Sequence, residues 1–427
     1  MADPIDNNLG HYIRELTLIT KVGNFDITDK FEELNIYDSI FTPCMTGNIL
    51  ITDAIDMSST FNFDGSELIK VDIGKNQNFS FLTKSFKIYQ KGKTIPLNST
   101  SEQYILYFVS EEFYVSKTQK LNKVYNERTY SSIVQEILSE NLSLNYGYRV
   151  EETTGLVKYP SNNRSPIDCI YDITKKAISA EDQSPTFVFF ENKDGYNFTS
   201  LSNIAKQIPI TKINYEPKLF GVKRDDSFSG ARYMEVVSQF DVAKNIETGV
   251  YGSRGVFVDI LNRKIVTKDT GPISFNDKSK QLNKTPDIAP ISQALNPNLC
   301  TRLYYGPTVS GTLYNDWIKD NNPTFINTID DSTKYLTERP ALMSKYTSKR
   351  VKLVMPGNFN LMCGTIVDLS VSSRSQNMES DSEDDSLSGK YIVLACRNII
   401  KYDRHETIIE ISTDSNNKKQ LYKPVQE

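Results

Sequence analysis

The sequence predicts a mainly β protein with α+β insertions, in which two related antiparallel β-barrels are separated by inserted domains. Short segments in which apolar and polar residues alternate, as in half-buried strands, occupy both ends of the chain. One N-terminal stretch also has the same order and spacing of apolar residues as a C-terminal stretch. Between them the apolar period changes to about 3.6, which predicts inserted helices.

Composition excludes several classes of protein. The chain has 427 residues, of which 38% are hydrophobic and 24% charged, and this suits a globular protein with more than one core. Its 49 basic and 53 acidic residues are spread along the chain, so no basic face is expected to bind nucleic acid. The N-terminal residues lack the pattern of a signal peptide, and no apolar run is long enough for a membrane anchor.

The cysteines predict neither disulfides nor a metal site. They number five, an odd count, and no CxxC pair occurs among Cys44, Cys169, Cys300, Cys363 and Cys396. We expect reduced, mostly packed thiols. No motif for a cofactor or a metal is found.

Residues 1–116 are predicted to form a first antiparallel barrel or sandwich. Turn-forming Gly, Pro and Asn separate the expected strands. These strands are 12–20, 47–54, 68–73, 86–90 and 104–115.

Residues 117–213 are predicted to form an inserted α+β domain. Residues 129–142 place apolar side chains on one helical face, after hydroxyl residues that can cap the helix. A second helix is expected over 165–180, because Ser165 can cap it and Pro166 suits its first position. The segment TFVFFENKDGYNFTSL then reads as a hairpin with its tip at 193–195.

The second barrel is predicted from 214–240 together with 345–413. Between these segments, residues 241–344 are rich in Asn, Asp, Lys and Pro and contain the only tryptophan, Trp317. They are either a loosely structured excursion or a binding surface. Residues 414–427 are predicted to be a polar tail.

An internal similarity suggests that the two barrels are duplicates. Phe63 followed by 68–73 has the same apolar and polar order and spacing as Leu361 followed by 366–371, with Gly65 or Gly364 between. The pattern is equally consistent with a chance similarity and with duplication of a β-barrel.

The segment GKYIVLACRNIIKYDRHETIIEIS, residues 389–412, contains the most reactive-looking cluster in the chain. Only two histidines exist, His11 and His405, so a catalytic triad needs one of them. Alternation predicts a hairpin that places Cys396 in a strand, on the side of Ile392, Leu394 and Ile400. Asp403, His405 and Glu406 then lie at the tip, about 15 Å or more away. A packed thiol and a polar turn are favoured over an active site.

Other candidate motifs also favour structural interpretations. KGKT at 91–94 lacks the earlier glycine of a phosphate-binding loop and reads as a hairpin turn, and DSEDDSLSG from Asp381 departs from a calcium loop at its sixth and twelfth positions. The pairs Glu111–Glu112 and Glu151–Glu152 are too common to indicate a glycosidase. No catalytic, cofactor-binding or metal-binding residue is assigned, and the chain is not expected to be an enzyme.

Three segments together resemble the central baseplate hub protein of contractile-tailed, T-even-like bacteriophages. The strongest is GNFNLMCGTIVDLSV followed, after a loop, by SGKYIVLACRNIIKYDRHETIIEIS. The helix at 165–180 followed by TFVFFENKDGYNFTSL is similar to the family's helix and Phe-Val-Phe hairpin, and TGNILITDA through DGSELIKVDI matches its first barrel more loosely. Residues 241–340 match poorly.

The resemblance implies a structural function in the virion. It implies two tube-type β-barrels per chain, a homotrimeric ring that adapts the sixfold tail tube to the threefold central spike, and a channel for DNA. The implied partners are the spike protein, the tail tube or tube-initiator protein and other inner baseplate proteins. The implied location is the tail baseplate, assembled in the host cytoplasm. Two alternatives remain open, the hub of a bacterial contractile injection machine and a tail-tip cell-wall hydrolase using Cys396 or Cys169 with His405.

Overall fold

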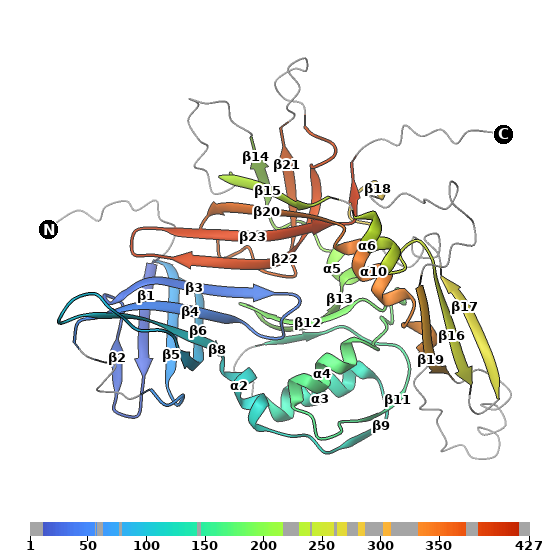
Figure 1. The fold of residues 1–427 in the computed structure, drawn as a ribbon, viewed down its shortest axis with the longest axis horizontal. Coiled ribbons are helices and arrows are strands. Elements are labelled where there is room, and N and C mark those ends of the chain that lie inside the picture. The colour runs from blue at the N-terminus through green and yellow to red at the C-terminus, as the bar shows by residue number, and fades with distance from the viewer. Residues whose placement is uncertain are drawn as a thin grey trace.

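The computed structural model describes residues 12–55, 57, 63–76, 79–142, 147–216, 230–239, 241–259, 263–270, 281–286, 302–308, 332–372 and 383–417. A 14-stranded sheet dominates this part of the chain, so the predicted mainly β class is confirmed. The sheet combines an N-terminal β unit and a C-terminal β unit, which lie against each other in Figure 1. The smaller, helix-containing parts are attached to one side of the sheet.

The first β unit is built from the N-terminal residues. Its strands are β1 (Tyr12–Ile19), β2 (Asn24–Asp26), β3 (Phe31–Ser39), β4 (Thr46–Asp53), β5 (Leu68–Asn76), β6 (Phe79–Lys91), β7 (Ile95–Pro96) and β8 (Glu102–Ser110). Alternating side chains from β1, β3, β4, β5, β6 and β8 fill one apolar core. The expected strand 104–115 is too long, since residues after Ser110 form the helix α2 (Glu111–Thr118). The KGKT segment also differs from a simple turn, because Gly92 donates a backbone hydrogen bond to Ile105 along β8.

The inserted α+β region follows. It contains β9 (Val124–Arg128), α3 (Tyr130–Asn141), β10 (Tyr148–Val150), β11 (Val157–Pro160), α4 (Pro166–Thr174), β12 (Phe187–Asn192), β13 (Gly195–Ser200) and α5 (Leu201–Ala205). Thr129 caps α3 and Ser165 caps α4, as the sequence predicts. α4 stops at Thr174, earlier than expected. The predicted hairpin is formed by β12 and β13, with Asn192 opposite Gly195.

The second β unit consists of β14 (Lys212–Tyr215), β15 (Tyr233–Ser238), β20 (Lys349–Pro356), β21 (Ile366–Val371), β22 (Gly389–Ile400) and β23 (His405–Thr413). Between β15 and β20 lie α6 (Val242–Glu247), β16 (Ser253–Asp259), β17 (Lys264–Thr270), β18 (Thr285–Pro286), β19 (Arg302–Thr308), the 3-10 turn η1 (Ser332–Lys334) and α10 (Glu338–Tyr346). The start of the expected polar tail is ordered, because β24 (Ser415–Asn416) pairs with β18 and Asp414 is buried.

The two β units share one strand order. In the first unit the order is β3-β4-β8-β6-β5-β1, and in the second it is β15-β20-β23-β22-β21-β14. If the six strands of each unit are numbered along the chain, both sheets have the same spatial order, 2-3-6-5-4-1. They differ at the last pair, which is antiparallel for β1 and β5 but parallel for β14 and β21.

A bulge recurs at the same place in both units. The pairing of β6 with β8 skips Tyr89, and the pairing of β22 with β23 skips Leu394. Just before each bulge, a backbone hydrogen bond joins Ile88 to Glu67 in one unit and Val393 to Thr365 in the other. A bulge bends its strand at a defined position. The two units therefore match in local detail as well as in topology.

Candidate functional site

The most distinctive site in the chain is the junction between the two β units. β22 is long enough to serve both units, since its first residues pair with β21 and its last residues pair with β3 of the first unit. The register runs from Ala395 opposite Ser39 to Ile400 opposite Leu34. At the bulge, the Leu394 carbonyl accepts a hydrogen bond from the Ile40 N–H at 2.9 Å. The junction is thus a continuous main-chain ladder.

Charged side chains reinforce the ladder at its partly exposed rim. Arg397 donates to the Asn35 amide oxygen at 3.0 Å and stacks over Tyr37. Lys401 lies 2.9 Å from Glu33. Burial opposes ionisation of Glu33, but hydrogen bonds from Asn35 and Lys401 outweigh it and lower the pKa of this carboxyl.

Apolar side chains cross the junction. Ile400 on β22 and Phe359 in the β20–β21 connection belong to the second unit in sequence, yet they pack in the core of the first unit. Phe359 stacks on Phe81 with ring centroids 5.8 Å apart. Ile400 lies opposite Leu34, and both side chains are fully buried. Burial of an aliphatic side chain of this size contributes roughly 1.5–3 kcal/mol.

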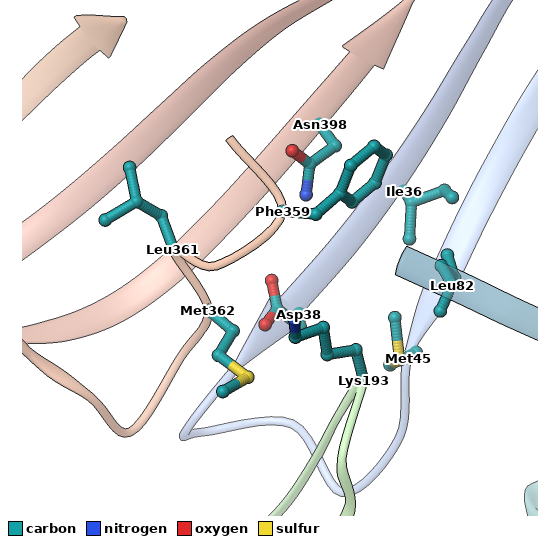
Figure 2. Close-up of a pocket in the computed structure, with 9 residues that line it drawn as sticks. All are labelled: Ile36, Asp38, Met45, Leu82, Lys193, Phe359, Leu361, Met362 and Asn398. Carbon is teal, nitrogen blue, oxygen red and sulfur yellow. The ribbon is translucent and has the colours of Figure 1, made fainter. Parts of the chain in front are cut away.

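A buried carboxyl lies at the centre of the junction. Asp38 on β3 accepts a hydrogen bond from the Cys363 N–H at 2.9 Å. Burial raises the pKa of Asp38 to about 6, against the hydrogen bonds that favour its charged form. Asp38 lines a cavity of about 10 Å³, roughly the space that one water molecule needs. Figure 2 shows the side chains around this cavity. Side chains from both β units and Lys193 of the β12–β13 hairpin line it.

The reactive-looking residues of 389–412 do not form an active site. His405 is not a turn residue, because it begins β23 and is buried beside Phe359. It is also nearer to Cys396 than expected, since Asn398 contacts both the Cys396 sulfur and the His405 ring. Burial and the neighbouring Asp38 raise the pKa of the Cys396 thiol well above its ordinary value, which disfavours the nucleophilic thiolate. Asp403 is exposed at the hairpin tip, as predicted.

The bulge also corrects the predicted side of Cys396. Alternation alone places this thiol with Ile392 and Leu394, but Leu394 is the extra residue and the alternation shifts after it. Cys396 instead packs in the core of the second unit with Val393. Ile392 and Leu394 face a separate apolar cluster shared with the inserted region.

The remaining candidate residues stay apart from one another. Cys169 is buried inside α4, and burial raises the pKa of its thiol. Glu151 accepts hydrogen bonds from Thr199 and Ser200, a positioning contact for β13. Glu383 in the acidic loop pairs with Lys212 at 3.3 Å. The described residues include no cluster of side chains suited to a metal ion. His11, Cys300, Trp317 and Asp381 lie outside the described residues.

A buried ionic cluster ties the inserted region to the first unit, and the sequence analysis missed it. The Glu191 carboxylate on β12 accepts hydrogen bonds from the Met45 N–H at 2.8 Å, from the Ser110 hydroxyl and from the Lys84 ammonium. Lys84 also lies 3.5 Å from Glu112. One feature of the sequence could have indicated this cluster. Glu191 lies within the apolar run FVFFEN, and a glutamate is costly to bury unless its charge is paired.

The fold of this chain is similar to the folds of known tail proteins. A tail protein from Neisseria meningitidis MC58 covers 95% of this chain and 97% of its own length, with a TM-score of 0.53 at 9% identity. A 43 kDa tail protein of prophage MuSo2 from Shewanella oneidensis covers 94% of this chain and 99% of its own length, with a TM-score of 0.53 at 8% identity. At these identities the likeness concerns the fold. No family model matches the sequence.

A curated relative indicates the particular kind of tail protein. The chain is 23% identical, over 97% of its length and 96% of the relative's, to the "Probable baseplate hub protein gp334" of Vibrio phage KVP40. The resemblance to phage baseplate hub proteins is therefore confirmed, and with it the location in the tail baseplate of a virion. The described residues contain no helix long and apolar enough to cross a membrane.

Proposed function

We propose that three copies of this chain form a ring at the hub of the baseplate, in which six β units surround a channel for DNA. The ring would match the sixfold tail tube on one side and the threefold central spike on the other. Tube or tube-initiator protein, spike protein and other inner baseplate proteins would be its partners. This function is structural and requires no catalysis.

The observation that carries this proposal is the repetition of one β unit twice in the chain. Two units with the same strand order and the same bulge present two nearly equivalent surfaces. A threefold ring of such chains presents six, so a repeated unit suits an adaptor between sixfold and threefold partners. The side-by-side contact through β22 and β3 supplies a lateral arrangement that a ring can repeat.

The buried ionic cluster supports a rigid placement of the inserted region in this ring. Glu191 and Lys84 come from different parts of the chain and are both almost completely buried. Buried charges are tolerated only where hydrogen bonds and opposite charges replace the lost water, so such a contact is stable only in a well-defined geometry. The inserted region would therefore sit at a fixed position relative to the wall formed by the β units.

The oligomeric state in solution tests the proposal. Native mass spectrometry and sedimentation of the purified full-length chain should show a species of three chains, with or without added spike protein. A chain that stays monomeric at all accessible concentrations, even with the spike protein present, contradicts the ring. A stable dimer or hexamer would contradict the threefold arrangement specifically.

A further inference from the structure

The buried ionic cluster between the inserted region and the first β unit contains two carboxyl groups but one ammonium group. Lys84 lies on β6, Glu112 on α2 and Glu191 on β12. The three residues are 4%, 5% and 0% exposed. If all three side chains were ionised, two negative charges would face one positive charge. Water cannot reach this excess negative charge, and an uncompensated charge in a protein interior is costly.

The two carboxyl groups differ in the hydrogen bonds that they receive. The Glu191 carboxylate accepts hydrogen bonds from three donors. These are the Met45 N–H at 2.8 Å, the Ser110 hydroxyl and the Lys84 ammonium. The Glu112 oxygen that lies 3.5 Å from Lys84 is buried and accepts no hydrogen bond from the part of the chain that the structure describes. The donors of the cluster therefore suffice for one carboxylate and not for two.

Neighbouring groups do not supply the missing positive charge. Lys117, on the same helix as Glu112, is partly exposed and pairs with Asp168 at 2.7 Å. The N-terminal end of α2 contributes only a partial positive charge. Cys44 and Tyr196 are neutral, because burial and the Glu191 charge raise the pKa of the Cys44 thiol to about 12 and that of the Tyr196 hydroxyl well above its ordinary value. No group of side chains suited to a metal ion occurs within the described ranges, so a proton is the group left to neutralise the cluster.

We propose that Glu112 and Glu191 share one proton in the folded chain, so that the contact between the inserted region and the first β unit depends on pH. The shared proton leaves one carboxylate beside one ammonium, and the cluster is then neutral. Two carboxyl groups in one buried site titrate as a pair, and the second ionisation is displaced to higher pH. Burial raises the pKa of Glu191 against the effect of Lys84, in agreement with this displacement.

The proton links pH to one particular contact of the fold. While the proton is bound, Glu191 on β12 holds the inserted region against Lys84 on β6 and against the Met45 N–H. When the proton is lost at higher pH, the excess charge opposes burial, and the contact should open more often. The cluster lies within one chain, so this inference does not depend on the proposed ring.

The pH dependence of unfolding in the full-length chain tests the proposal. Glu112→Gln keeps the shape of the side chain and removes one negative charge. From pH 4.5, the ordinary value for a glutamate, up to the raised value in the folded chain, the folded natural chain keeps a proton that the unfolded chain loses. Its unfolding constant should therefore rise with pH more steeply than that of Glu112→Gln, by up to about tenfold for each pH unit.

The expected difference between the two chains is largest in alkaline solution. At pH 8 the unfolding constant of Glu112→Gln should be at least about tenfold smaller than that of the natural chain, and at pH 4 the two should agree within about twofold. Asp38 and Asp414 also have raised pKa values, but they are present in both chains and cancel in the comparison. Equal pH slopes overturn the proposal, and so does a lower stability of Glu112→Gln at pH 8.

The matched control removes a carboxylate that is paired at the surface. Glu181 is exposed and lies 2.8 Å from Lys206, so Glu181→Gln should follow the pH curve of the natural chain. Hydrogen exchange at pH 8 locates the effect. Peptides that contain Met45 and β12 should exchange faster in the natural chain than in Glu112→Gln, whereas peptides from β20 and β23 should not differ. An equal change in all these peptides contradicts a local contact.

Infrared spectroscopy detects the shared proton without unfolding the chain. A protonated carboxyl group absorbs apart from a carboxylate, so one such band of the natural chain at pH 6.5 should be missing in Glu112→Gln. Glu191→Gln should also lose this band, because Glu112 is then the only carboxyl partner of Lys84 in the cluster. It should in addition be less stable, since an amide cannot replace the carboxylate as acceptor of three hydrogen bonds. A band that persists in both variants places the proton elsewhere and overturns the proposal.

Discussion

Asp38 and Cys363 are 325 residues apart in sequence, yet the Asp38 carboxylate accepts the Cys363 N–H at 2.9 Å in the junction between the two β units. This contact places a titratable group where the units meet. Because burial raises the pKa of Asp38 to about 6, ionisation of this carboxyl opposes folding.

The stability of the chain should therefore respond to pH through Asp38. Between about pH 4 and pH 6 the folded state keeps the proton that the unfolded state loses, so the free energy of unfolding falls as pH rises, and the full cost persists above pH 6. Asp38→Asn should be up to about 3 kcal/mol more stable than the natural chain at pH 7.5, with the difference vanishing near pH 4. Urea unfolding at the two pH values measures this, and a difference independent of pH contradicts it.

The Glu191 cluster predicts a large loss of stability on truncation. Glu191→Ala removes the hydrogen-bonded partner of the buried Lys84 ammonium, which keeps only the longer contact with Glu112 among its ion pairs, and should lower the free energy of unfolding by about 3 kcal/mol. Glu181→Ala is the control, since it removes an exposed ion pair with Lys206 and should cost less than about 1 kcal/mol. Equal midpoints for the two variants in urea would show that the buried pair does not hold the inserted region in place.

The two β units, which share one strand order, contain a matched pair of glycines. Gly65 and Gly364 precede equivalent strands with φ of +86° and +78°, so alanine is strained at both positions. A Cβ at Gly364 would lie 2.3 Å from the Phe190 ring, whereas a Cβ at Gly65 meets no described atom within 4 Å. Gly65→Ala should cost about 1 kcal/mol, and Gly364→Ala at least about 2 kcal/mol more. Thermal unfolding compares them, and similar costs would argue against the tight fit on β12.

Thiol chemistry separates a structural Cys396 from a catalytic one. Since the thiol is buried and its pKa lies well above the ordinary value, alkylation by iodoacetamide in the folded chain should be at least about 100-fold slower than in urea. Peptide mapping by mass spectrometry measures the rates. Rapid, selective alkylation of Cys396 in the folded chain would favour the hydrolase hypothesis, as would cell-wall degradation that is lost in His405→Ala.

The local sequence pattern was enough to predict most of the helices and strands. It did not predict the contacts between distant parts of the chain. The Thr129 and Ser165 caps and the hairpin at 193–195 follow from nearby residues, so sequence predicts them well. The match between 68–73 and 366–371 identified equivalent strands, β5 and β21. Alternation failed at Leu394, because a bulge reverses the faces without any local signal.

The site itself depends on contacts between residues far apart in the chain. The pairing of β22 with β3 joins segments about 360 residues apart, and Glu191 meets Lys84 across 107 residues. Hydrophobic periodicity reports which face of a strand is buried but not which strand lies beside it. The sequence pattern therefore does not predict the junction, which depends on the pairing of β22 with β3 in the folded chain.

Electron microscopy of the purified assembly tests the central claim most directly. Averaged views along the ring axis should show threefold symmetry with six similar lobes, two per chain, around a central channel. Views with twofold symmetry, with three lobes only, or with isolated single chains at concentrations where the mass shows one species would contradict a ring built from two equivalent β units per chain.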